Sequence, residues 1–194
     1  MDSAGEQQVV DRFGHSGYAV VILAPEDIQG EIELVRRQLE IPIHMIPAHV
    51  TVKGTFIDPP SVEEVSTIVE NVAQATQTFV MRTGETLAWG REKSRTAVIS
   101  VNSSDQLDDL HRQLFSSIEP ITTNVYGAEK AEGFRFHMTV YQDVDEANHI
   151  KGQALVAGLS VPERVVANSL CLMGRSGPRG PRGAWHVIEE TPLR

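Results

Sequence analysis

The sequence has very little cysteine and no long apolar segment. Cys171 is the only cysteine, so the chain can form no internal disulfide, and a reducing cytoplasm is the expected location. The longest apolar run, residues 18–25, is far shorter than the roughly 18 residues that a membrane-spanning helix needs. Residues 1–6 contain neither the basic nor the apolar stretch of a secretory signal. We therefore expect a cytoplasmic protein with no membrane partner.

Basic residues are also scarce relative to acidic ones. The 194 residues include 17 Lys and Arg against 26 Asp and Glu, which gives a net charge of −9. Proteins that coat long duplex nucleic acid neutralise many phosphates with Lys and Arg, so this balance argues against that class. A small nucleotide or a short RNA end stays compatible if its site is locally positive. The chain is long enough for one core, and we expect a monomer.

The spacing of apolar residues predicts alternating strands and helices in the first half. Residues 1–16 hold few apolar anchors and are expected to form a mobile lead-in. Further on, β-branched runs predict strands, and apolar residues three and four apart predict helices. Ser61 and Glu64 form the pattern of a helix capping box. The predicted order is strand 18–24, helix 27–39, strand 49–52, helix 61–72 and strand 78–88.

The same order of elements returns in the second half of the chain. The tetrapeptide HMTV at residues 137–140 matches HVTV at residues 49–52, at an offset of 88. Further matches are residues 18–22 with 96–100, and RRQL at 36–39 with HRQL at 111–114. The second copy is completed by a helix after residues 96–100, a helix over 145–159, a strand over 163–173 and a closing strand over 185–188. An ordered set of matches favours duplication over coincidence.

This duplication predicts an α+β fold made of two repeats related by a pseudo-twofold axis. The repeats cover about 18–90 and about 95–190, and a linker of about residues 90–95 joins them within a single bilobal domain over 17–194. We expect antiparallel sheets that line a central cleft, with helices on the outside.

The two matching tetrapeptides place the same polar residues on one face of a strand. Residues two apart in a strand project from the same face, so His49 lies beside Thr51, and His137 beside Thr139. Under a pseudo-twofold axis, both faces can line one cleft. Two imidazoles can supply the acid and the base of a phosphodiester reaction near neutral pH, and hydroxyl groups can donate to the phosphate oxygens. This scheme needs no metal ion and no other cofactor.

The two HxTx tetrapeptides resemble the signature of the 2H phosphoesterase superfamily, which includes 2'-5' RNA ligase-like proteins and RNA 2',3'-cyclic phosphodiesterases. The resemblance extends to the order of elements over nearly the whole chain. It implies metal-independent chemistry on a 2',3'-cyclic phosphate or a related 2'-5' or cyclic nucleotide linkage. The resemblance implies that His49, the histidine of the first motif, protonates the leaving oxygen and that His137, the histidine of the second, activates water. Thr51 and Thr139 would hold the phosphate.

Several Lys and Arg residues are candidates for supplying positive charge to the predicted site. The family often has a basic residue shortly after the second motif, but here Tyr141–Asp143 follow it, so Lys53 after the first motif is the candidate instead. Arg135 shares a face with His137 by alternation, and we expect it to contact the phosphate. The Gly-rich segment 174–183 is either a flexible connection or a basic rim for a nucleotide or RNA phosphate. The arginines of that rim would be Arg175, Arg179 and Arg182.

Other readings of these residues are weaker. A zinc site would draw on His44, His49, His137 and His186, but no short ligand spacing accompanies them. The histidines outside the motifs, Cys171, and Trp89 and Trp185 are expected to be packing or surface residues, although either tryptophan could stack a base. The leading hypothesis is a cyclic phosphodiesterase. A non-catalytic module that binds nucleotides or RNA ends, and a 2'-5' ligase with the same site, stay open as alternatives.

Overall fold

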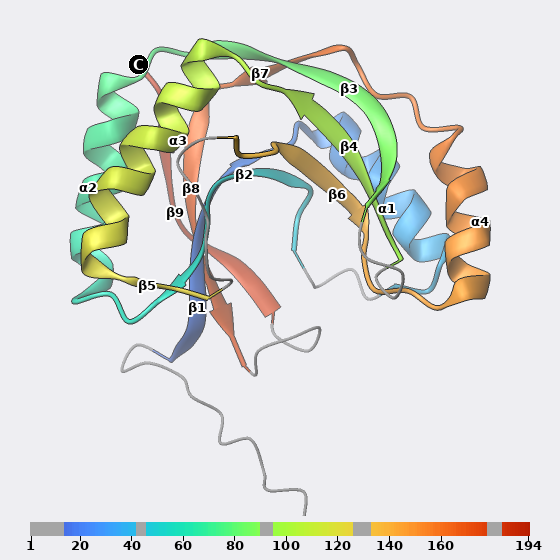
Figure 1. Ribbon diagram of the computed structural model, residues 1–194, viewed down its shortest axis with the longest axis horizontal. Coiled ribbons are helices and arrows are strands. Elements are labelled where there is room, and N and C mark those ends of the chain that lie inside the picture. The colour runs from blue at the N-terminus through green and yellow to red at the C-terminus, as the bar shows by residue number, and fades with distance from the viewer. Residues whose placement is uncertain (1–13, 42–45, 90–94, 126–132, 178–183) are drawn as a thin grey trace, which may run out of the picture.

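The computed structural model describes residues 14–41, 46–89, 95–125, 133–177 and 184–194 (Figure 1). The predicted linker lies outside these ranges except for Arg95. The predicted lead-in also lies outside them, except for its last three residues, of which His15 and Ser16 already belong to the first strand. No helix in the described ranges is long and apolar enough to cross a membrane.

Nine strands and four α-helices make up the described fold. The strands are β1 (His15–Leu23), β2 (His49–Ile57), β3 (Phe79–Trp89), β4 (Thr96–Asn102), β5 (Thr123–Asn124), β6 (His137–Tyr141), β7 (Arg164–Ala167), β8 (Ser169–Ser176) and β9 (Ala184–Pro192). The helices are α1 (Glu26–Gln38), α2 (Val62–Ala75), α3 (Asp105–Ile118) and α4 (Glu146–Val156), and a short 3-10 helix, η1 (Glu119–Ile121), follows α3.

All nine strands join one antiparallel sheet, which confirms the predicted α+β class. Its order is β7-β3-β4-β6-β2-β1-β8-β9, and β5 pairs with the far end of β2. The order is symmetric about the contact between β6 and β2, because each of these strands is flanked by the first strand of its own repeat, β4 or β1. The predicted cleft is therefore lined by one continuous sheet rather than by separate ones.

The two repeats exchange their third strands across this sheet. β3 belongs to the first repeat but pairs with β4 of the second, and β8 of the second repeat pairs with β1 of the first. The short connection between Trp89 and Thr96 explains the first exchange, because those two residues pair directly as neighbours in a hairpin. Each spatial half of the molecule is thus built from both repeats.

The strand predicted over residues 163–173 is in fact two strands, and the break explains the curl of the sheet. β7 pairs with β3 at one end of the sheet, whereas β8 pairs with β1 near the other end. Only Asn168 separates β7 from β8, so these two places in the sheet must come close in space. A flat sheet of this order could not satisfy that connection, and the sheet therefore bends into a half-barrel (Figure 1).

The four helices cover the convex face of the half-barrel in two pairs. α1 packs on β6 and beside α4, while α3 packs on β2 and beside α2, which also contacts β8 and β9. Figure 1 shows the two pairs at opposite sides of the molecule. The apolar stripes of α1, α2 and α3, together with Val156 of α4 and the alternate residues of the strands, form one large core. Ser61, Ser104 and Asp145 cap α2, α3 and α4, each accepting from a backbone N–H three residues on.

Candidate active site

The pairing of β2 with β6 brings the two HxTV motifs side by side. Val50 pairs with Met138 in antiparallel register, so His49 lies opposite Thr139 and Thr51 lies opposite His137. Val50 and Met138 are buried under the helices. Their polar neighbours alternate to the other, concave face of the sheet, where all four are half-buried.

The four polar side chains therefore occupy the corners of a small rectangle. Neighbouring strands lie about 4.8 Å apart, and residues two apart along a strand are separated by about 6.7 Å. The two histidines stand on one diagonal, with their Cα atoms about 8 Å apart, and the two threonines stand on the other. A phosphate group placed between the corners can be reached from both sides by an imidazole.

The same backbone hydrogen bond fixes the tautomer of both motif histidines. Nδ1 of His49 lies 2.7 Å from the carbonyl oxygen of Pro47, and Nδ1 of His137 lies 2.8 Å from that of Arg135. A carbonyl only accepts hydrogen bonds, so in each ring Nδ1 carries the hydrogen and Nε2 is the atom that gains or loses a proton. Each ring can act as a base when neutral and as an acid when protonated.

Both imidazoles are held in the neutral form before a ligand binds. The pKa of His49 is lowered to about 4, chiefly by burial and also by the positive charges of Arg36 and of protonated His137, against the raising effect of the Pro47 carbonyl. Burial also lowers the pKa of His137, and the Arg135 carbonyl opposes this shift. An anion bound between the two rings would favour protonation of either one.

Two residues on the helices hold the motif strands from the convex side. Arg36 of α1 is 7% exposed and donates to the carbonyl oxygens of Thr139 and Val140, at 2.9 and 2.8 Å. His111 of α3 is fully buried, and its Nδ1 lies 2.7 Å from the Val52 carbonyl. The sequence contained a signal for both residues, because they head the matching RRQL and HRQL segments.

Lys53 does not lie where the sequence predicted a substrate contact. Val21 pairs with Thr51 but Val20 pairs with Lys53, so β2 has a bulge that turns Lys53 toward the helices. Its ammonium group is fully buried, donates to Oδ1 of Asn124 at 2.7 Å and lies 5.3 Å from the ring centre of Phe115. With no exposed surface, it offers nothing to a ligand on the concave face.

The predicted basic rim is also corrected in part. Arg175 is 4% exposed, donates from Nε to Oγ of Ser16 at 3.1 Å and stacks on the ring of Trp185. These contacts make Arg175 and Trp185 packing residues. Arg179 and Arg182 lie outside the described residues, as does the side chain of Trp89. Arg135 is exposed just before β6, beside the second motif, and its contact with a phosphate stays a prediction.

The zinc alternative finds no support among the described side chains. In the described ranges no three His, Cys, Asp or Glu residues gather closely enough to hold a metal ion, and His44 lies outside these ranges. Cys171 is fully buried in β8, and burial raises the pKa of its thiol to about 12, so it is a packing residue.

The concave face differs sharply on the two sides of the motif strands. Beyond Thr51, the row across β1 and β8 consists of Val21 and Cys171, which are fully buried in a second apolar cluster with Ile46 and Trp185. Beyond Thr139, the row across β4 and β3 begins with Val98, which is also buried at 1% exposed, and ends at Leu87, which is 46% exposed. Toward β8 the row is buried throughout, whereas toward β3 it ends in an exposed apolar side chain.

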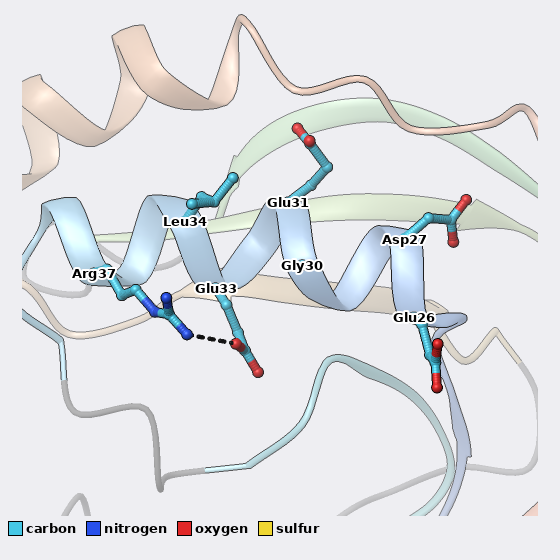
Figure 2. A pocket seen from close by; sticks show the side chains of 7 residues that line it. All are labelled: Glu26, Asp27, Gly30, Glu31, Glu33, Leu34 and Arg37. Atoms are coloured by element: carbon cyan, nitrogen blue, oxygen red, sulfur yellow. Dashed lines mark hydrogen bonds and ion pairs between the residues drawn. The ribbon is translucent and has the colours of Figure 1, made fainter.

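A separate hollow of about 360 Å³ lies on α1 (Figure 2). It is lined by Glu26, Asp27, Gly30, Glu31, Glu33, Leu34 and Arg37. None of the motif residues reaches it, and α1 packs on the convex side of the sheet. Its carboxylates would repel a phosphate, so this hollow does not suit the ligand predicted for the motif strands.

The fold and the paired motifs have clear counterparts among known proteins. Residues 24–179 match the family model of the 2'-5' RNA ligase superfamily. A protein of Oceanobacillus iheyensis, named only provisionally as a phosphoesterase, is 23% identical over 151 residues, which is 76% of this chain and 84% of that protein.

Solved structures share the fold at low sequence identity. E. coli LigT, crystallised with 3'-AMP, is 17% identical with a TM-score of 0.58, and the match covers 91% of this chain and 97% of LigT. The protein TT0787 of Thermus thermophilus is 15% identical with a TM-score of 0.61, over 92% and 98% of the two chains. Fold and site thus define a duplicated α+β protein with a paired-histidine centre. The chain belongs to the 2'-5' RNA ligase superfamily, which is a family of 2H phosphoesterases.

The pKa shifts make a direct prediction for the free protein. We expect the imidazole of His49 to titrate with a midpoint near pH 4, and that of His137 below its ordinary value of about 6.5, both with the hydrogen on Nδ1 when neutral. Two-dimensional 15N NMR over a pH series measures midpoints and tautomers, with His49→Gln and His137→Gln supplying the assignments. An unshifted His49 midpoint, or a neutral ring with the hydrogen on Nε2, would contradict the geometry.

Proposed function

We propose that this chain is a metal-independent phosphodiesterase that opens 2',3'-cyclic phosphates on nucleotides or short RNA ends. The observation that carries the proposal is the rectangle of two histidines and two threonines at the β2–β6 contact. It supplies an acid, a base and two hydroxyl donors on one face of two neighbouring strands. Family membership supports phosphoester chemistry, and the occurrence of E. coli LigT with 3'-AMP, ATP and NADP+ supports a small nucleotide as ligand.

The reaction proceeds by attack of water on phosphorus. Nε2 of neutral His137 accepts the proton of the water, and the new P–O bond forms as the bond to the 2' or 3' oxygen breaks. Protonated His49 donates its Nε2 hydrogen to that leaving oxygen. Thr51 and Thr139 donate hydrogen bonds to the non-bridging oxygens. This assignment of acid and base follows the family resemblance, and exchanging the two roles describes the reverse reaction.

The pair must carry a single proton to be active. Below about pH 4 both rings are protonated and the base is lost. Above that limit the single proton of the free protein rests mainly on His137, because the pKa of His49 is lowered further, so the assigned roles use the less populated form in which His49 carries the proton. Above the lowered pKa of His137 both rings are neutral and the acid is lost. The profile of kcat/KM, which reports the free protein, should therefore peak between these limits, on the acidic side of pH 6.5. A bound phosphate anion raises both pKa values, so the profile of kcat should lie at higher pH.

The part of the concave face over β4 and β3 is where the nucleoside of the substrate would lie. The row from Thr139 to Leu87 spans two strand spacings, about 10 Å, and offers an exposed apolar side chain at its end. The opposite row is filled by buried side chains. We therefore place the base and ribose over β4 and β3, with the phosphate between the histidines.

Turnover without metal is the first test of the proposed function. In excess EDTA, we expect hydrolysis of nucleoside 2',3'-cyclic monophosphates or of short RNAs with cyclic-phosphate ends. His49→Ala and His137→Ala should each lower kcat by about 10²–10⁴-fold, because each removes one proton-transfer group. His186→Ala, an exposed histidine on β9, is the matched control and should retain activity. Activity that disappears in EDTA, or that survives in both motif variants, would contradict the mechanism.

The same experiment separates the alternatives. If the ligands bind but none is turned over, and the histidine variants lose only affinity, the chain is a binding module. Joining of RNA ends through a 2'-5' linkage, in place of hydrolysis, would identify a ligase with the same residues.

The placement of the nucleoside predicts a residue that affects KM more than kcat. Leu87→Asn should raise KM for a nucleoside cyclic phosphate by about fivefold, because it removes roughly 1 kcal/mol of apolar contact, and should leave kcat nearly unchanged. Leu34→Asn is the control, since Leu34 is 52% exposed on α1 and lies away from the motif strands. Equal KM values for Leu87→Asn and the wild type would place the nucleoside elsewhere.

A further inference from the structure

We propose that Arg36 is a positioning residue of the active site, which ties the two motif strands together and sets a fixed positive charge behind the phosphate position. The inference rests on the proposed function in one respect, namely that the ligand at the motifs is a phosphate or its ester. Its first part is geometric and concerns only this chain.

The guanidinium of Arg36 bridges the contact on which the site depends. Nε and Nη2 donate to the carbonyls of Val140 and Thr139 on β6, and Nη1 donates to the carbonyl of Ile46, at 2.8 Å, in the segment that leads into His49. The ladder between β2 and β6 is short, with one pair of partners, whereas β1 and β2 share five. Arg36 therefore adds three hydrogen bonds where the sheet itself supplies few.

The charge of Arg36 is buried and forms no ion pair among the described residues. Its three hydrogen bonds all go to carbonyl groups. Glu33 is the carboxylate that acts on it from a distance, and Glu33 itself pairs with Arg37 at 3.4 Å on the exposed side of α1. A guanidinium keeps its proton even when buried. Because one of its carbonyl partners belongs to Thr139, a residue of the rectangle, the charge acts on the site through a weakly screened interior.

The electrostatics of His49 agree with this placement. The positive charges that act on its ring come from Arg36 of α1 and from His137 of β6, and both oppose protonation, while the Pro47 carbonyl favours it. The same field that opposes a second positive charge stabilises an anion between the two rings. Arg36 thus acts on the His49 ring through the interior of the protein, whereas Lys53 and Arg175 are not among the charges that shift the pKa of that ring.

Comparison of the two repeats shows that the hydrogen bond from the helix to the motif strand does not require a permanent positive charge. At the position equivalent to Arg36, His111 donates from Nδ1 to the Val52 carbonyl of the other motif strand. Both motif strands are therefore tied at their fourth residue by the helix of the opposite repeat. On the β6 side the donor is a guanidinium, which donates to three carbonyl groups and carries a permanent positive charge.

The test compares Arg36 with its neighbour in sequence. Arg37 is exposed and pairs with Glu33 on the outer face of α1, so Arg37→Gln is the matched control (Figure 2). Binding of inorganic phosphate is measured by calorimetry, and the titration of His49 by NMR. We expect Arg36→Gln to weaken phosphate binding by about tenfold or more, equivalent to about 1.4 kcal/mol, and to move the His49 midpoint upward. Arg37→Gln should change neither quantity.

Arg36→Lys separates charge from geometry, and it keeps the test decisive if Arg36→Gln does not fold. A lysine retains the positive charge but lacks the planar guanidinium that donates to three carbonyl groups. Phosphate affinity should therefore stay within a few-fold of wild type, while kcat falls at least tenfold. A folded Arg36→Gln with wild-type phosphate affinity and an unchanged His49 midpoint would overturn the inference. So would an Arg36→Lys variant with wild-type kcat.

These readouts distinguish the inference from the proposed function. Phosphate binding and the His49 titration need no turnover, so their dependence on Arg36 would stand even if no cyclic phosphate were hydrolysed. Conversely, hydrolysis that depends on both histidines but not on Arg36 would keep the function and remove the inference.

Discussion

The pairing of Val50 with Met138 is the contact on which the rest of the site depends. It lies at the centre of the sheet order, and it alone sets His49 opposite Thr139 and Thr51 opposite His137. A shift of this register by one residue would turn the polar corners into the helix-covered core and bring apolar side chains to the concave face. The curl of the sheet, the helix pairs on its outer face and the ties from Arg36 and His111 all support this one contact.

The two repeats give the site its symmetry, and the different surroundings of the two motifs give it a direction. Three features occur once in each repeat. They are the hydrogen bond between Nδ1 of the motif histidine and a backbone carbonyl, the helix side chain that binds the carbonyl of the fourth motif residue, and the motif threonine. The surroundings differ, because Val21 and Cys171 fill one side of the concave face whereas Leu87 is exposed on the other. An active site with two equivalent acid–base groups needs such a difference to hold a substrate in one orientation.

Much of this could be predicted from the sequence, because strand alternation and repetition are local signals. The HxTV motifs, the order of elements and the buried Cys171 follow from spacing alone. The direction of Lys53 could not be predicted, since it depends on a bulge that pairing with β1 creates. The burial of Arg175 and the exchange of β3 and β8 likewise depend on partners distant in the chain. Arg36 was visible in the matching RRQL segment, but its role requires the three carbonyl contacts.

The most direct test of the account is a double-mutant comparison of the two motif histidines. If His49 and His137 act on one phosphate as a single acid–base pair, His49→Gln and His137→Gln should each remove nearly all turnover. The double variant should then be scarcely slower than either single one. Losses that multiply in the double variant would show that the histidines act independently, and would contradict a shared site at the β2–β6 contact.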